Sequence, residues 1–168
     1  DVKEVPYNCL RGDALKYGRR FYQWKAIDEC TRYRFVYAFE EHTPENTVKF
    51  LKMLLKEFPL KIQKIQTDNG TEFTYKYISD NEISPLDKVL QALKIPHILI
   101  PPRALWHNGK VERSHRNDQR YFYNWETFKT HDELNEKLKK HLEWSNNKIM
   151  RTLGKKSPVQ LLAEKLAA

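Results

Sequence analysis

The chain has 168 residues, of which 40% are hydrophobic and 31% are charged, with a net charge of +8 and an isoelectric point near 9.4. This length and composition fit one globular domain and exclude a wholly disordered chain. No apolar run is long enough to span a membrane. The positive charge favours nucleic acid as a partner ahead of an acidic membrane surface, although a basic surface without a partner would give the same composition.

The first predicted elements are strands. Residues 1–7 have the pattern of a strand. Residues 8–20 are polar and contain two glycines, so we interpret them as a hairpin insertion. Aromatic and β-branched residues in 21–28 and 34–41 predict two more strands, and the turn-like segment 29–33 between them predicts an antiparallel pair.

Helices and short strands follow. Residues 43–58 predict a helix, because Thr43 suits the N-cap and Pro44 suits the first helical position. The apolar face predicted for this helix consists of Val48, Leu51, Leu54, Leu55 and Phe58. Further strands are predicted at 61–68 and 95–101, a loop at 102–109, and helices at 84–94, 110–125 and 131–147.

The order of these elements predicts the fold class. Strands come first as a meander and then alternate with helices. This order is typical of an α/β domain with a mixed sheet flanked by helices, rather than of a doubly wound parallel sheet.

Three acidic residues occur where carboxylates could converge: Asp1 on the first strand, Asp68 at the end of the fourth and Glu112 at the start of a helix. Hard divalent cations bind carboxylate oxygens, and two such ions about 4 Å apart can promote displacement at a phosphodiester. These acids are therefore candidate metal ligands. The sequence also allows a local explanation, because Asp68-Asn69-Gly70 favours a turn and the helix dipole favours an acid at position 112.

Two motifs bear on this choice. The segment "TDNGTEF" (67–73), followed by "HNGKVERSHR" (107–116), resembles the catalytic core shared by retroviral integrases and bacterial insertion-sequence transposases, the DDE family. The tail "NNKIMRTLGKKSPVQLL" (146–162) resembles the bacterial ending "YNxxRPHxxLGxxTPxxxL", from which Met150 and Thr152 depart. The resemblance extends over essentially the whole chain.

The resemblance implies an RNase H-like fold with a five-stranded mixed sheet. It also implies a metal-dependent transposase or integrase that nicks DNA at element ends and transfers the 3′-hydroxyl to target DNA by in-line phosphoryl transfer. Two Mg²⁺ or Mn²⁺ ions are expected when DNA is bound. In this family pattern Asp68 matches the second catalytic, metal-binding acid and Glu112 the third. Asp1 matches the first, in competition with Asp28.

Two further expectations follow from the resemblance. Residues 1–168 would be one catalytic core excised from a longer bacterial protein, with its N-terminal DNA-recognition domain absent. This protein would act in the cytoplasm at the nucleoid, as a homodimer or higher assembly on paired DNA ends. The interval from Asp68 to Glu112 is longer than is usual in the family, and residues 74–88 are expected to hold the extra length as a loop insertion.

Basic and polar residues near Glu112 are candidate DNA contacts. Arginines recur at intervals of three and four residues, which suits a row of phosphate contacts but also an ordinary solvated helix face. The segment before them could form a loop over the DNA end, although its glycine could serve only a turn. The candidate DNA-binding residues are Asn108, Gly109, Lys110, Arg113, Arg116 and Arg120.

The sequence supports other sites and functions less well. His107 and His115 lack the partners of a zinc site, and Trp106 is the tryptophan that could stack on a base. An RNase H-like nuclease acting on RNA–DNA hybrids would share the carboxylates but lack the "NGxxER" helix and the tail. A DNA-binding module with a decayed site would bind DNA without magnesium, but intact Asp68 and Glu112 argue against it.

Overall fold

A computed structural model describes residues 1–79, 81–101 and 108–167. In these residues, strands β1 (Val2–Glu4), β2 (Tyr22–Ile27) and β3 (Arg34–Phe39) form an antiparallel sheet in the order β1-β2-β3. Strands β4 (Ile65–Thr67) and β5 (His97–Leu99) form a separate parallel pair. The predicted antiparallel pair is confirmed. A single five-stranded mixed sheet is not confirmed, because the described strands form two sheets.

Two helices begin where their capping residues predict. In α2 (Pro44–Glu57), the hydroxyl of Thr43 accepts a hydrogen bond from the amide of Asn46 at 3.3 Å. In α3 (Pro85–Ala92), the hydroxyl of Ser84 accepts from the amide of Asp87 at 3.1 Å. Each cap satisfies an amide that the first helical turn leaves without a partner. The predictions of both helix starts are therefore confirmed.

The buried face of α2 differs from the predicted one. Its buried residues are Asn46, Thr47, Phe50, Leu51 and Leu54, whereas Leu55 is exposed. Tertiary contacts explain the difference. The Thr47 hydroxyl accepts a hydrogen bond from the indole of Trp24 at 3.0 Å, and the ring of Phe50 packs 5.4 Å from that of Phe35.

The segment after β1 is helical, so the prediction of a hairpin insertion over residues 8–20 is wrong. It contains a 3-10 turn, η1 (Tyr7–Cys9), and the short helix α1 (Gly12–Lys16). The amide of Phe128 donates to the carbonyl of Cys9, and the amide of Arg11 donates back to the carbonyl of Phe128, both at 2.8 Å. The segment is therefore tied to the domain, and its residues Cys9, Leu10 and Ala14 are part of the hydrophobic core.

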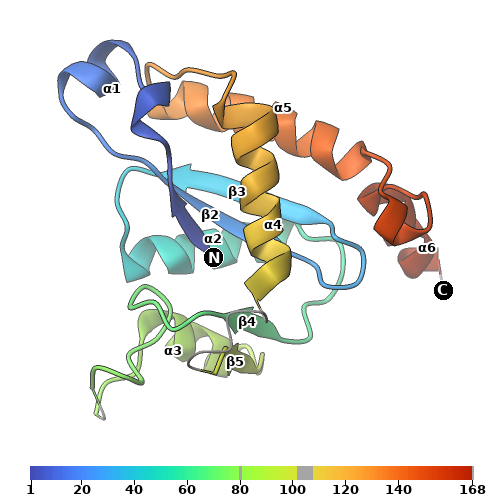
Figure 1. Ribbon diagram of the computed structural model, residues 1–168. Coiled ribbons are helices and arrows are strands. Elements are labelled where there is room, and N and C mark those ends of the chain that lie inside the picture. Colours follow the sequence, from blue (N-terminus) through green and yellow to red (C-terminus); the bar gives the residue numbers. More distant parts are fainter. Residues whose placement is uncertain (80, 102–107, 168) are drawn as a thin grey trace.

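The C-terminal third is helical. It contains α4 (Gly109–Asp118), a π-helical turn η3 (Gln119–Tyr123), α5 (His131–Asn147), a 3-10 turn η4 (Arg151–Leu153) and α6 (Pro158–Ala167). Figure 1 shows α4 crossing the three-stranded sheet, with its first residues near β4 and its end near α5. Among the described residues, no helix is both long and apolar enough to cross a membrane.

The two faces of the three-stranded sheet bury different kinds of side chain. Alternation along β2 and β3 directs Trp24 and Phe35 to the side of α2, where they belong to an apolar cluster. The opposite face carries Gln23, Lys25 and Arg34, all buried, toward α4. Helix α4 therefore packs on a polar strip of the sheet, which has both faces covered.

Candidate active site

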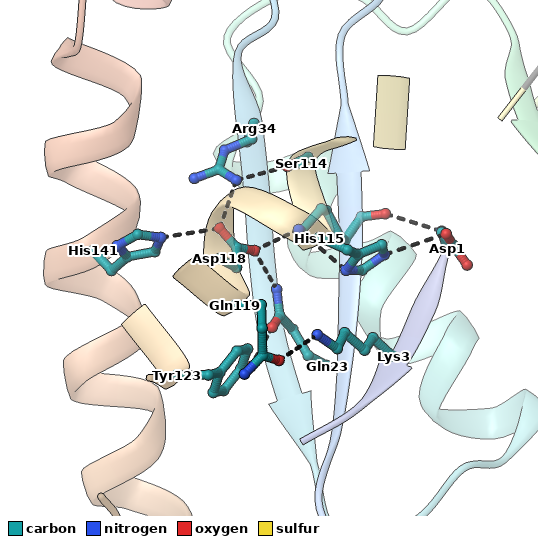
Figure 2. Close-up of polar contacts among 11 residues, drawn as sticks. Asp1, Lys3, Gln23, Arg34, Ser114, His115, Asp118, Gln119, Tyr123 and His141 are labelled. Carbon is teal, nitrogen blue, oxygen red and sulfur yellow. Dashed lines mark hydrogen bonds and ion pairs between the residues drawn. The ribbon is translucent and has the colours of Figure 1, made fainter. Parts of the chain in front are cut away.

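Asp1 is held between the sheet and α4. The amide of Lys25 on β2 donates to the Asp1 carbonyl oxygen at 2.9 Å. The carboxylate oxygen Oδ1 accepts from the amide of Val2 at 2.8 Å. The other oxygen, Oδ2, accepts from Nδ2 of Asn108 at 3.4 Å and lies 3.2 Å from Nε2 of His115 (Figure 2). The first strand thus brings this acid to the start of α4.

Asp68 directly follows β4, in a turn that is fixed by hydrogen bonds. Its Oδ1 accepts from the amide of Gly70 at 3.1 Å, so the residue does act as a turn former. Nδ2 of Asn69 donates to the carbonyl of Ile100 at 2.9 Å and ties the turn to the end of β5. Within the described part of the chain, Oδ2 of Asp68 accepts no hydrogen bond and remains available to a ligand.

A chain of hydrogen-bonded side chains, Thr67, His97 and Asp87, is joined to the turn of Asp68. Nδ1 of His97 lies 2.6 Å from Oδ1 of Asp87, and Nε2 of His97 lies 2.9 Å from the hydroxyl of Thr67. The same order of hydroxyl, imidazole and carboxylate groups also occurs in the catalytic triads of hydrolases, where the hydroxyl is the nucleophile. Here the hydroxyl of Thr67 is buried and donates to the carbonyl of Asp68 at 2.7 Å. We therefore interpret the chain as an anchor for the turn of Asp68.

Glu112 is in the first turn of α4 and is exposed. Residues 108, 112 and 115 fall on one side of a helix, because they are spaced by four and three positions. Asn108 and His115 both contact Asp1, so Glu112 is on the helix face that meets Asp1. Glu112 forms no ion pair or hydrogen bond with any residue that the structure describes.

The start of α4 links the first strand to the region of Asp68. Asn108 and His115 contact Asp1, and Figure 1 shows the first residues of α4 near β4, the strand that directly precedes Asp68. Even so, no three His, Cys, Asp or Glu side chains among residues 1–79, 81–101 and 108–167 are already arranged around one ion position.

Asp28, the alternative first acid, is engaged elsewhere. Its Oδ2 accepts hydrogen bonds from the amide and the hydroxyl of Thr31, at 2.6 and 2.7 Å. The amide of Arg32 donates to its carbonyl oxygen at 2.9 Å. This carboxylate stabilises the turn between β2 and β3, which favours Asp1 over Asp28 as the first acid.

Behind Asp1 is a group of buried ionisable side chains, here called the charged cluster: Lys25, Arg34, Asp118 and His141 (the last three are labelled in Figure 2). Oδ2 of Asp118 contacts the ammonium of Lys25, and Oδ1 lies 2.8 Å from Nη1 of Arg34 and 3.0 Å from Nε2 of His141. Burial alone would raise the pKa of Asp118. The hydrogen bond with His141 and the charges of Lys25 and Arg34 outweigh burial and hold this pKa far below its ordinary value.

The candidate DNA-binding residues lie along one surface. Arg113, Arg116 and Arg120 are exposed, and Arg120 also packs over the ring of Tyr121. Lys110 forms an ion pair with Glu29.

The segment before these arginines is described only in part. Gly109 is the first residue of α4, and Asn108 is its N-cap. Trp106 and His107 lie outside the described residues. The structure thus arranges an exposed basic surface beside Glu112 and gives Asn108 a contact with Asp1.

Sequence comparison identifies a family. The model of the family "Integrase core domain" matches residues 4–105, more than half of the chain, including Asp68 but neither Asp1 nor Glu112. "Putative integrase ORF3" of Spiroplasma virus SpV1-C74 is 28% identical over 96% of this chain and 49% of its own length. The "Retrovirus-related Pol polyprotein from transposon RE1" of Arabidopsis thaliana is 30% identical over 54% of this chain and 6% of its own length. The chain thus spans about half or less of these relatives.

Solved structures show the same fold. The catalytic core domain of BIV integrase superposes with a TM-score of 0.62 and 19% identity, covering 88% of each chain. The HTLV-2 integrase catalytic core domain, solved in complex with magnesium in a trimeric form, gives a TM-score of 0.64 and 17% identity, covering 95% of this chain and 90% of that one. The α/β fold is therefore similar to that of retroviral integrase catalytic cores.

Proposed function

Because this chain belongs to the integrase core family, we propose that residues 1–168 form the catalytic core of a metal-dependent transposase or integrase. The reaction would begin with hydrolytic nicking at the ends of a DNA element. The freed 3′-hydroxyl would then attack a phosphodiester of target DNA in line. The observation that best supports this function is the contact of Asp1 with Asn108 and His115, which brings the first acid to the helix that carries Glu112.

The proposed metal ligands are Asp1, Asp68 and Glu112, all of which offer the carboxylate oxygens that Mg²⁺ and Mn²⁺ prefer. Glu112 is exposed, and it has no cationic partner among the described residues that a metal ion would have to displace. Two such ions, when bound, would neutralise negative charge that develops on the attacking and leaving oxygens. The donor set therefore fits the proposed chemistry.

The exposed basic residues would hold the DNA over the acids. Arg113 and Arg116 flank the third acid on α4, and guanidinium groups bind phosphate oxygens in a geometry that carries little sequence information. Asn108, Gly109 and Lys110 would contact the DNA end. We propose two DNA partners, the element end and the target, and an assembly of at least two copies acting at the bacterial nucleoid in the cytoplasm.

A branched DNA substrate tests this function without knowledge of the natural ends. A branched oligonucleotide that mimics a strand-transfer product should be resolved by the protein in magnesium, because a catalyst also accelerates the reverse reaction. We expect resolved and rejoined strands with Mg²⁺ or Mn²⁺ and none with a chelator. Cleavage of an RNA–DNA hybrid without rejoining of the branched DNA would indicate a nuclease instead. DNA binding that is independent of magnesium, with no reaction, would indicate a decayed site.

Replacing Arg116 by alanine is expected to weaken DNA binding through a lost phosphate contact. The plot of log affinity against log salt concentration should become shallower by about 0.9 for each phosphate contact that is lost. Fluorescence anisotropy with a duplex oligonucleotide measures this slope over a salt series. Arg19→Ala is the matched control, because Arg19 is also exposed but pairs with Glu40. Equal slopes for both variants and the unchanged protein would show that Arg116 does not contact a DNA phosphate.

A further inference from the structure

A buried chain of polar side chains leads from the charged cluster to Asp1. Lys25 has an exposed fraction of only 2%, and its ammonium contacts both the carboxylate of Asp118 and Nδ1 of His115, the latter at 3.2 Å. On its other side, the ring of His115 presents Nε2 to Oδ2 of Asp1. Figure 2 labels Asp118, His115 and Asp1 of this chain, with His115 between the other two.

The contact with Lys25 fixes which ring nitrogen of His115 carries hydrogen. An ammonium group has hydrogen atoms but no lone pair, so Lys25 can only donate to Nδ1. If the ring is neutral, the hydrogen must then be on Nε2. A doubly protonated ring would carry a hydrogen on Nδ1, facing the hydrogens of the Lys25 ammonium at 3.2 Å, so this contact also requires a neutral ring. The side chain is therefore an Nε2–H donor.

The acceptor that suits this donor is Asp1. Nε2 of His115 is buried, and it completes no hydrogen bond with any residue that the structure describes, although Oδ2 of Asp1 is only 3.2 Å away. An unsatisfied buried donor costs about 1–3 kcal/mol. A small rotation of the Asp1 carboxylate would complete the bond, so this cost favours carboxylate orientations in which Oδ2 faces His115.

We propose that His115 is a positioning residue that orients the carboxylate of Asp1 through Nε2–H, and that Lys25, paired with Asp118, holds the ring in the required tautomer. This inference rests on the proposed function, because the orientation of Asp1 matters only if it binds a metal ion. Carboxylates that bind metals are commonly hydrogen-bonded themselves, and losing such a partner costs about 10- to 100-fold in metal affinity or activity.

The tautomer can be tested without metal or DNA. In protein labelled with ¹⁵N-histidine at pH 6.5, the ring of His115 should give the nitrogen shifts and couplings of an Nε2–H tautomer. His115→Gln assigns the signal. In Lys25→Met the ring should shift toward a mixture of tautomers, because nothing then donates to Nδ1. An Nδ1–H ring or a doubly protonated ring in the unchanged protein would overturn the proposal, whatever Lys25→Met does to folding.

Metal affinity tests the effect on Asp1. Calorimetric titration with Mn²⁺ should show affinity about 10- to 100-fold weaker in His115→Leu than in the unchanged protein. His115→Gln keeps an N–H donor in a similar place and should recover most of the affinity. The matched control is His141→Leu, which removes another buried histidine from Asp118 without touching Asp1 and should lower stability only.

These results separate the positioning role from the proposed function. Unchanged Mn²⁺ affinity in His115→Leu, or equal losses in His115→Leu and His141→Leu, would contradict positioning by His115. If the unchanged protein bound no divalent cation, the proposed function would fail together with the role of Asp1 as a ligand. The tautomer would still show whether Lys25 sets the state of the ring.

Discussion

Replacing Asp68 by asparagine is expected to lower the rates of nicking and strand transfer by a factor of about 10³ or more, because the proposed metal site would lose one of its charges at the reacting phosphate. The same change should leave the fold intact. Asparagine can also accept the hydrogen bond that Oδ1 of Asp68 receives from Gly70. The substitution therefore separates the proposed metal-binding role of this residue from its turn-forming role.

The measurement compares reaction rates on the branched DNA with midpoints of urea unfolding. Asp1→Asn and Glu112→Gln should show similar losses of rate, while the DNA affinity of all three variants is kept. Asp28→Asn is the matched control, because its carboxylate binds Thr31 in a turn, and its rate should be close to that of the unchanged protein. Activity that survives in Asp68→Asn would make Asp68 a turn residue only. Activity lost in Asp28→Asn but kept in Asp1→Asn would exchange those two assignments.

The second large effect concerns stability. Asp118→Asn is expected to lower the free energy of unfolding by about 3–5 kcal/mol, because it leaves buried cations without their counter-charge. Lys25 and Arg34 are both in contact with this carboxylate, which has an exposed fraction of 1%. Urea unfolding followed by circular dichroism measures the change. A loss below about 1 kcal/mol, the value for an exposed ion pair, would contradict the importance of the cluster.

A control and a pH dependence sharpen this test. Asp132→Asn removes a carboxylate that is 96% exposed beside His131, and it should change stability by no more than about 0.5 kcal/mol. The pKa of Asp118 is lower in the folded chain than its ordinary value of 3.8, so its stabilisation is complete above that pH and decreases as the pH falls below it. Asp118→Asn should therefore lose less stability than the unchanged protein between pH 4 and pH 2.

The parts of the fold that local chemistry determines could be predicted from the sequence. Thr43 and Ser84 cap the helices that they precede, because each hydroxyl bonds to an amide only three residues away. Residues 8–20 could not be predicted in the same way. Their polar composition favours an exposed hairpin, but Leu10 and Ala14 are buried, and the segment pairs with Phe128 from the far end of the chain.

In the candidate site, too, some features follow from the local sequence and others depend on contacts between distant residues. Asp68 and Glu112 occur in motifs that are recognisable along the chain, whereas the side chains that contact Asp1, Asn108 and His115, come from the start of α4 far away in the sequence. Lys25 and Gln23 alternate with apolar residues on β2, a pattern that ordinarily directs polar side chains to water. In the structure both face Asp118, which is 93 residues from Lys25 and 95 from Gln23 in the sequence. No local pattern could have indicated that this strand face is buried.

The charged cluster also determines when the candidate site can form. The contacts of α4 and its N-cap with Lys25 and Asp1 join residues 90 to 114 positions apart. Closing such loops lowers the entropy of the chain before the contacts can stabilise it. Long-range contacts of this kind therefore slow folding. We expect Lys25 and Asp118 to stay hydrated until α4 docks on the sheet, because the two side chains, one on β2 and one on α4, are buried in contact with each other. A nascent chain on the ribosome would therefore have no assembled site until α4 has emerged, and Asp1 would reach its partners in the step that removes water from the cluster.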